Sequence, residues 1–171
     1  MAKNCLNKLT GNILNGCDFW QNGIKDIYLM YPQDVSFTFA NDGAIRTVTF
    51  VEGAKSYKIE GYKQSIQITT TSKALDATNK LNASVSFKIN PNTSRVRSFL
   101  MGRFIVMEVP YSGVSKIFGI QSPLECSAFD WDSNANGRLA TVTLSDPDGS
   151  AGNYMDDVEP TAINQIISKS V

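Results

Sequence analysis

The sequence predicts a mainly β fold, an antiparallel β-sandwich or split barrel with one packed helix and a short C-terminal helix. Roughly nine or ten short apolar or alternating runs are separated by Gly, Pro, Asn and Asp, as in all-β domains. A single helical pattern interrupts this series, which argues against parallel βαβ units. The length of 171 residues fits one domain, because one core commonly serves about 100–200 residues.

Three segments are expected along the chain. Residues 1–23 are rich in Asn and Gly, with scattered rather than periodic apolar residues, and predict an N-terminal arm. Residues 24–158 predict the single β-domain. Residues 159–171 predict a C-terminal helix or clamp, because Pro160 suits a first helical position.

The first half of the β-domain predicts four short strands. The clearest pair alternates with period two on both sides of Asn41-Asp42-Gly43, a strong signal for a tight hairpin turn. The predicted strands are residues 24–30, 35–40, 44–52 and 56–60.

Two longer strands, residues 62–71 and 81–89, each combine an apolar face with a polar face of mainly small residues. In the second strand, Ala83, Val85, Phe87 and Ile89 are among those expected to face the core. The polar segment between the strands, residues 72–80, predicts a flexible loop or one helical turn.

After Asn90-Pro91-Asn92, a short helix is expected to begin at a Thr93 or Ser94 cap and to run to Met101, with Gly102 ending it. Its predicted buried residues are Val96, Phe99 and Leu100. The later strands are expected at residues 103–109, 115–121, 124–131 and 138–144. The C-terminal helix is expected to bury Ile163, Ile166 and Ile167.

The charge balance of 16 basic against 16 acidic residues excludes a simple basic nucleic-acid binder. The absence of histidine excludes triads, Cys-His pairs and HExxH zinc sites. The sequence contains neither of the two glycine motifs that bind phosphate groups, G-x-G-x-x-G after a predicted strand and G-x-x-x-x-G-K-[ST]. Cys5, Cys17 and Cys126 are widely spaced and are expected to be free thiols. We therefore expect no enzyme and no cofactor.

The most site-like stretch is the segment from Asp130 to Gly137. Asp132, Asn134 and Asn136 match ligand positions of a calcium loop, but Thr143 stands where a bidentate Glu is needed, so a polar hairpin turn is favoured. Two carboxylate pairs, Asp130 with Asp132 and Asp156 with Asp157, suggest acid/base chemistry only superficially. Asp156 and Asp157 are adjacent and would point to opposite faces of a strand, and the turns that hold both pairs are expected to face solvent.

No apolar run has the length of a signal peptide or a membrane span, so folding in a cytosol without a membrane span is expected.

The polar face of the two long strands carries the candidate functional residues. A sheet with such a face lines a wet channel in some barrels, and the alternative is an ordinary solvent-facing surface. The candidate channel-facing residues are Gln67, Thr69, Ser84, Ser86 and Lys88.

The C-terminal half has a recognisable order: the helix SRVRSFLMG, the strand RFIVMEV, the segment VSKIFGIQSPLE and then CSAFDWDSNANGRLATVTLSD. Together with the N-terminal NGCDFWQNGIKDIYLM, it resembles tail-tube-like and tail-hub structural proteins of tailed bacteriophages that infect Bacteroidetes. This resemblance covers most of the chain as element order, through short motifs.

The resemblance implies a non-enzymatic virion protein, made in the host cytoplasm, that assembles with copies of itself into a ring or tube of the phage tail. One sheet of each subunit would line a lumen through which DNA passes without specific binding. The segment of residues 72–80 would contact the next ring, and the two terminal segments would clamp neighbouring subunits. Other tail or head-tail proteins would be further partners.

Two alternatives stay open. Within the same assembly, the chain would be a head-to-tail connector or tail-completion ring. From a different class, it would be a carbohydrate-binding β-sandwich module in which Trp20, Trp131 or Tyr154 stacks on sugars.

Overall fold

A computed structural model describes residues 23–60, 65–75, 78–134, 136–147 and 155–171. The predicted N-terminal arm therefore lies almost wholly outside the described residues, as do Cys5, Cys17, Trp20 and Tyr154. Within the described ranges the chain is mainly β, with antiparallel sheets and two α-helices, which confirms the predicted fold class.

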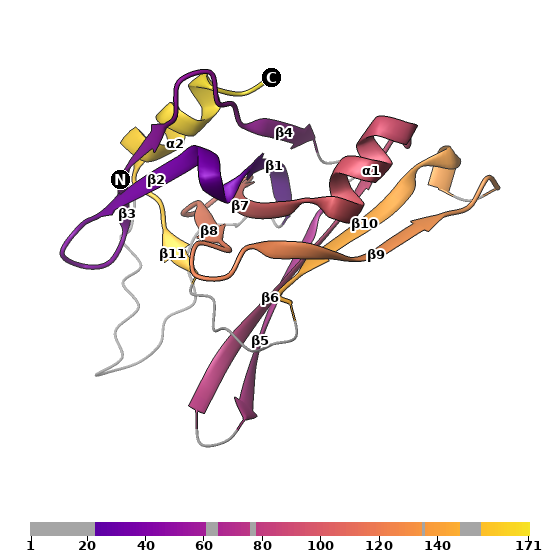
Figure 1. The fold of residues 1–171 in the computed structure, drawn as a ribbon. Coiled ribbons are helices and arrows are strands. Elements are labelled where there is room, and N and C mark those ends of the chain that lie inside the picture. The colour runs from indigo at the N-terminus through magenta and orange to yellow at the C-terminus, as the bar shows by residue number, and fades with distance from the viewer. Residues whose placement is uncertain (1–22, 61–64, 76–77, 135, 148–154) are drawn as a thin grey trace, which may run out of the picture.

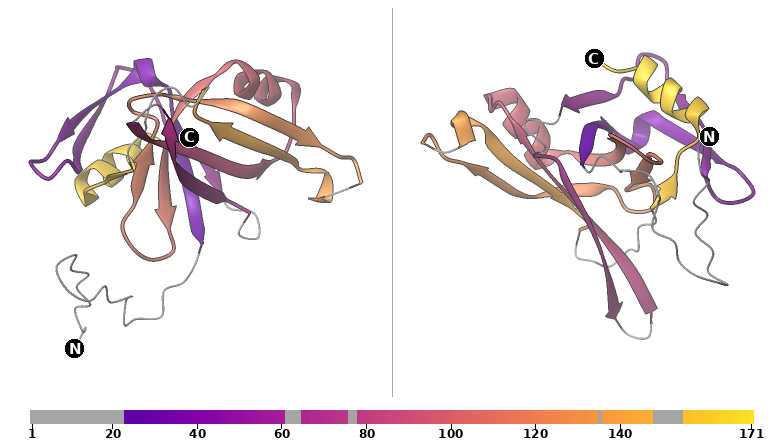
Figure 2. Two further views of the ribbon diagram at one scale, coloured as in Figure 1. Left: turned by 90° about the horizontal axis from the view of Figure 1, so that it is seen from below. Right: turned by 180° about the vertical axis from the view of Figure 1, so that it is seen from behind.

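Most strands belong to one nine-stranded sheet with the path β11–β8–β7–β9–β10–β6–β5, while β7 also pairs with β1, and β1 pairs with β4. The sheet bends so that its two halves face one another (Figures 1 and 2). Its strands are β1 (Ile24–Met30), β4 (Tyr57–Glu60), β5 (Gln67–Leu75), β6 (Thr78–Ile89), β7 (Arg103–Pro110), β8 (Lys116–Phe118), β9 (Leu124–Trp131), β10 (Ala140–Ser145) and β11 (Asp156–Asp157).

The smaller elements are a two-stranded sheet, two α-helices and two single-turn 3₁₀ helices. They are β2 (Val35–Phe39), β3 (Ile45–Phe50), α1 (Thr93–Met101), α2 (Pro160–Ser168), η1 (Pro32–Asp34) and η2 (Asn136–Arg138). The predicted hairpin around Asn41-Asp42-Gly43 is confirmed as β2–β3, and Gly43 has the positive φ of 89° that favours glycine.

Two hydrophobic clusters lie on opposite faces of β1 and β7. Ile27, Leu29 and Val106 belong to a core shared with β6, β10 and α1. Tyr28 and Met107 belong to a second core closed by β3 and α2. Since both faces of these two strands are covered, each contains a continuous apolar run, residues 27–30 and 104–107, instead of alternating throughout.

Helix α2 completes the second core. The Val48 N–H donates to Gln165 Oε1 at 2.7 Å, and the Ser56 hydroxyl donates to the Ile166 carbonyl at 2.7 Å. The expected stripe was partly wrong: Ala162 and Ile166 are fully buried, whereas Ile167 is 40% exposed. The buried pair is four residues apart, which places Ile167 on the neighbouring, outer side of the helix.

Helix α1 lies beside β9 and packs Phe99 against Phe87 and Phe104. Its cap is Asn92, whose Oδ1 accepts the Arg95 N–H at 2.9 Å, so the prediction of Thr93 or Ser94 was wrong by one or two residues. Leu100, expected in the buried stripe, is 57% exposed because Phe99 takes the inward position.

The prediction of a loop or helical turn at residues 72–80 was wrong. The ladder between β5 and β6 continues from Gln67 opposite Ser86 to Leu75 opposite Thr78, so the connection is only two residues long. Strand pairing overrides the polar composition here, since an antiparallel ladder satisfies backbone groups whatever the side chains. The hairpin projects away from the rest of the molecule (Figure 1).

In the described part of the chain, the helices are too short to cross a membrane.

Candidate functional site

Strands β5, β6, β10 and β9 share a mainly polar face. Strand β10 pairs with both β6 and β9, and β5 pairs with the other edge of β6. Core side chains such as Val85, Phe87 and Val142 are fully buried on the opposite face. The predicted alternation of residues 83–89 is therefore confirmed.

All five candidate residues predicted from the sequence lie on this polar face. Gln67 is directly opposite Ser86, and Thr69 is directly opposite Ser84. Lys88 lies two residues further along β6, on the same face. Gln67 and Thr69 are exposed, whereas the three β6 residues are half-buried among their cross-strand neighbours.

The register adds three residues of β10 that the sequence analysis did not single out. Thr141, Thr143 and Ser145 pair with Lys88, Ser86 and Ser84 in turn, and they are half-buried like those partners. The Thr143 and Ser86 hydroxyl oxygens are 3.5 Å apart. The alternation in RLATVTLS indicates that β10 has a polar face of its own. Only the register shows that this face is continuous with the polar face of β6.

Charge is sparse and nearly balanced on the four-stranded part of this face, whereas the outer hairpin pairs Lys73 with Lys80. Lys88, Thr141 and Asp130 form one cross-strand row, which places a cation and a carboxylate two strands apart, or about 10 Å between backbones. At the other end, Glu125 forms an ion pair with Arg103 at 2.6 Å. Hydroxyls, one amide and Ala128 of β9 lie between these charged residues.

Beyond this four-stranded region, the outer part of the β5–β6 hairpin has no third strand among the described residues. Strand β10 covers β6 only from Ser84 to Ile89, so the ladder from Thr71–Asn82 outward stands alone for about 15 Å. An isolated two-stranded hairpin is only marginally stable in water. At its base, the Asn82 Oδ1 is buried and has no hydrogen-bond partner among the residues that the structure describes.

The calcium-loop candidate forms a polar turn. Asp132 is exposed, and its Oδ1 accepts the Asn134 N–H at 2.8 Å, which uses the carboxylate to stabilise the turn itself. Among the described residues, no three His, Cys, Asp or Glu side chains lie close enough together to hold a metal ion. Asn136 lies in η2, at the end of this turn.

The other titratable candidates are held apart. Asp156 pairs with Ile117 and Asp157 with Lys116, so their side chains leave opposite faces of β11, and Lys116 Nζ is 2.6 Å from an Asp157 oxygen. Burial raises the pKa of Asp156. Burial also raises the pKa of Cys126. A raised pKa favours the protonated thiol over the thiolate, and the thiol is a poor nucleophile.

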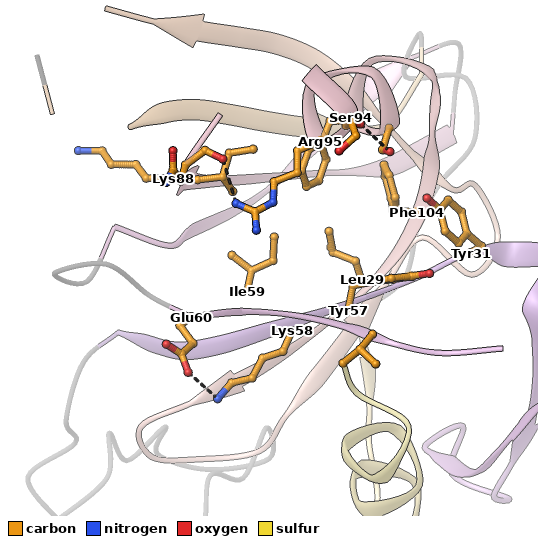
Figure 3. Close-up of a pocket in the computed structure, with 15 residues that line it drawn as sticks. Leu29, Tyr31, Tyr57, Lys58, Ile59, Glu60, Lys88, Ser94, Arg95 and Phe104 are labelled. Carbon is orange, nitrogen blue, oxygen red and sulfur yellow. Dashed lines mark hydrogen bonds and ion pairs between the residues drawn. The ribbon is translucent and has the colours of Figure 1, made fainter. Parts of the chain in front are cut away.

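A separate cleft of about 850 Å³ opens between β4 and the start of α1 (Figure 3). Leu29, Ile59 and Phe104 contribute an apolar floor. The Arg95 guanidinium extends into the cleft and donates through Nη1 to the Asn90 carbonyl at 3.1 Å. Tyr31 packs edge-on against Tyr57, with ring centres 5.9 Å apart.

A smaller apolar groove lies between α1 and β9, where Leu100, Met101 and Trp131 are exposed. The Trp131 indole N–H donates to the Arg138 carbonyl at 3.1 Å, which fixes the ring at the edge of the sheet.

Compared with protein-family models, curated proteins and solved structures, the chain gives no match.

Proposed function

We propose that this chain is a non-enzymatic structural protein of a phage tail, which self-associates into rings or a tube and forms a conduit for DNA. The observation that carries the proposal is the continuous polar face of β5, β6, β10 and β9, together with the projecting β5–β6 hairpin. The resemblance in element order to tail-tube-like proteins supplies the assembly.

The chemistry of the polar face supports a conduit more than a binding site. Binding to DNA is dominated by Lys and Arg contacts with phosphates. The middle of this face instead presents Gln67, Ser86 and Thr143, which do not attract phosphates strongly. Lys88 is offset by Asp130 in the same row, so a duplex that passes the four-stranded part would meet little net charge. The paired Lys73 and Lys80 lie beyond it, in the outer hairpin.

The projecting hairpin supports self-association. Its outer ladder lacks a covering element within the described residues, and the free edge of β5 exposes unpaired backbone groups, which are a template for pairing with another chain. A neighbouring copy that covers this hairpin would stabilise it. The ring-to-ring contact expected at residues 72–80 becomes, in this proposal, a contact made by strands.

Electron microscopy tests the assembly directly. Negative-stain images and light scattering of the purified protein at increasing concentration should show rings or stacked tubes. Single rings without stacking would favour the head-to-tail connector alternative. A strictly monomeric protein at high concentration would contradict both.

A shortened hairpin separates folding from assembly. Replacing residues 72–81 by Asn-Gly joins Thr71 to its partner Asn82 through a two-residue turn and removes only the projecting part. This variant should keep a cooperative unfolding transition but should no longer assemble. Replacing the exposed turn residue Asp132 by Ala is the control and should leave assembly unchanged.

The conduit is tested on assembled protein. The double variant Ser84→Lys/Ser86→Lys should raise the affinity for duplex DNA at low salt and steepen its salt dependence, because two cations per subunit would line the face. Unchanged DNA affinity in intact rings would mean that this face does not meet DNA.

A carbohydrate-binding module is the second candidate, supported by Trp131, whose ring is 52% exposed beside Leu100 and Met101. An exposed indole offers an apolar face for stacking on a sugar. Quenching of tryptophan fluorescence by a glycan, lost in Trp131→Ala, would support this function. The absence of quenching across a broad glycan panel would remove it.

A further inference from the structure

The outer edge of β4 is an open site for main-chain pairing. The Ser56 N–H and C=O groups bond to the C-terminal segment and so point away from β1. Because successive strand residues direct these groups to alternate sides, those of Lys58 and Glu60 point the same way. Within the described ranges, the backbone of Lys58 and Glu60 has no partner on that side.

The chain itself already begins a pairing on this edge. The Ser56 N–H donates to the Lys169 carbonyl at 3.1 Å, and the Val171 N–H donates to the Ser56 carbonyl at 3.1 Å, which together make a parallel bridge between Ser56 and Ser170. The chain leaves α2 toward β4 to do so (Figure 1). The edge therefore accepts an extended segment, but only its first residue is occupied.

The cleft of Figure 3 borders β4 on the side that faces α1. Its lining includes all four residues of β4 together with Val171, where the existing pairing stops. Leu29, Ile59 and Phe99 provide apolar positions on the inner side. The volume of about 850 Å³ lies in the range typical of ligand clefts, about 300–1,000 Å³.

Arg95 gives the cleft a charge preference. Its guanidinium makes the hydrogen bond to the Asn90 carbonyl, and no carboxylate of the described chain forms an ion pair with it. Lys58, in contrast, is held by Asp26 at 3.5 Å and Glu60 at 3.2 Å. A carboxylate that enters the cleft would meet the remaining Arg95 donors in the fork geometry suited to bidentate binding.

We propose that this cleft binds an extended peptide of another protein, which adds as a strand to the edge of β4 and places an acidic side chain on Arg95 between apolar residues. Adding a strand gives affinity through main-chain hydrogen bonds and specificity through alternate side chains. The proposal uses neither the polar face nor the projecting hairpin, so it stands independently of the phage-tail function.

Selection from a displayed library of random eight-residue peptides, with Arg95→Ala protein for counter-selection, provides the probe. The selected peptides should share one Asp or Glu flanked by alternating apolar residues. Their affinity, measured by fluorescence anisotropy, should fall by about 10- to 100-fold in Arg95→Ala, the range expected for loss of a charged hydrogen-bonded pair. Failure to enrich any Arg95-dependent consensus would overturn the proposal.

A proline at Glu60 tests the strand addition separately. Glu60→Pro removes an N–H that faces away from β1, and proline is tolerated at such edge positions. Glu60→Ala is the matched control, since it loses the same carboxylate but keeps the N–H. Binding should weaken in Glu60→Pro relative to Glu60→Ala, with both proteins folded by circular dichroism. Equal binding by the two variants would exclude strand addition, and a consensus that matches a segment of this chain would reassign the cleft to a second copy.

Discussion

Strands β1 and β7 are covered on both faces, whereas β5, β6, β10 and β9 are covered on one. In the first pair, consecutive residues such as Val106 and Met107 are both fully buried in different clusters. In β6, Phe87 is fully buried while its neighbour Ser86 faces the polar side. The comparison shows which half of the sheet is constrained by folding alone and which half has one face available for function.

The largest expected effect is the loss of a ring from the shared core. Phe87→Ala should lower the free energy of unfolding by about 3–5 kcal/mol, because Phe87 is fully buried and contacts Phe99. Denaturant unfolding followed by circular dichroism measures this change. A loss below about 1 kcal/mol would mean that the two halves of the sheet do not share one core.

Met107 tests the second cover of β7. Met107→Ala should cost about 2–5 kcal/mol, since its side chain is fully buried against the β3 and α2 side of the sheet. The same denaturant titration applies, with exposed Met101→Ala as the control. If both methionine variants unfolded like the wild type, α2 would not cover β7.

A smaller effect concerns the pH dependence of the doubly covered half. Burial raises the pKa of Glu108 above its ordinary value of 4.5, with Lys116 opposing the shift. The folded state therefore holds this proton more tightly than the unfolded state, so this contribution to stability is present below pH 4.5 and is lost as the pH rises through the folded pKa. Asp156 acts in the same direction.

The Glu108 contribution is isolated by comparing the wild type with Glu108→Gln. The wild type should lose stability relative to the variant as the pH rises above about 4.5, because only the wild type acquires the half-buried charge. Unfolding titrations at several pH values give this difference. A wild type that gains stability relative to the variant over that range would contradict the sign.

The smallest expected effect lies on the polar face. Ser86→Ala should change the free energy of unfolding by no more than about 0.5 kcal/mol, since its contact with Thr143 is long at 3.5 Å. Ser86 and Phe87 thus make a matched pair on one strand. If Ser86→Ala destabilised the monomer as strongly as Phe87→Ala, the polar face would be structural.

Local sequence patterns predicted the elements that depend on local chemistry. The β2–β3 hairpin follows from its turn residues, β9 was predicted at its observed bounds, and β6 follows from alternation over residues 81–89. The polar face was identified on two strands for the same reason.

Long-range pairing decided the rest. The outer β5–β6 ladder has no apolar alternation to reveal it, so residues 72–80 gave a wrong prediction. The continuation of the polar face into β10 depends on the register between distant strands, and the cleft at Arg95 depends on how β4 approaches α1. The cap at Asn92 instead of Thr93 or Ser94 reflects the one-residue choice among neighbouring polar side chains.

The closure of the second core by α2 has a consequence for the order of events during synthesis. Gln165 and Ile166 bond to Val48 and Ser56, at sequence separations of 117 and 110 residues. During synthesis, β1 and β7 therefore keep one apolar face uncovered until α2 has emerged from the ribosome. A chain truncated before α2 would present that apolar face to chaperones and proteases.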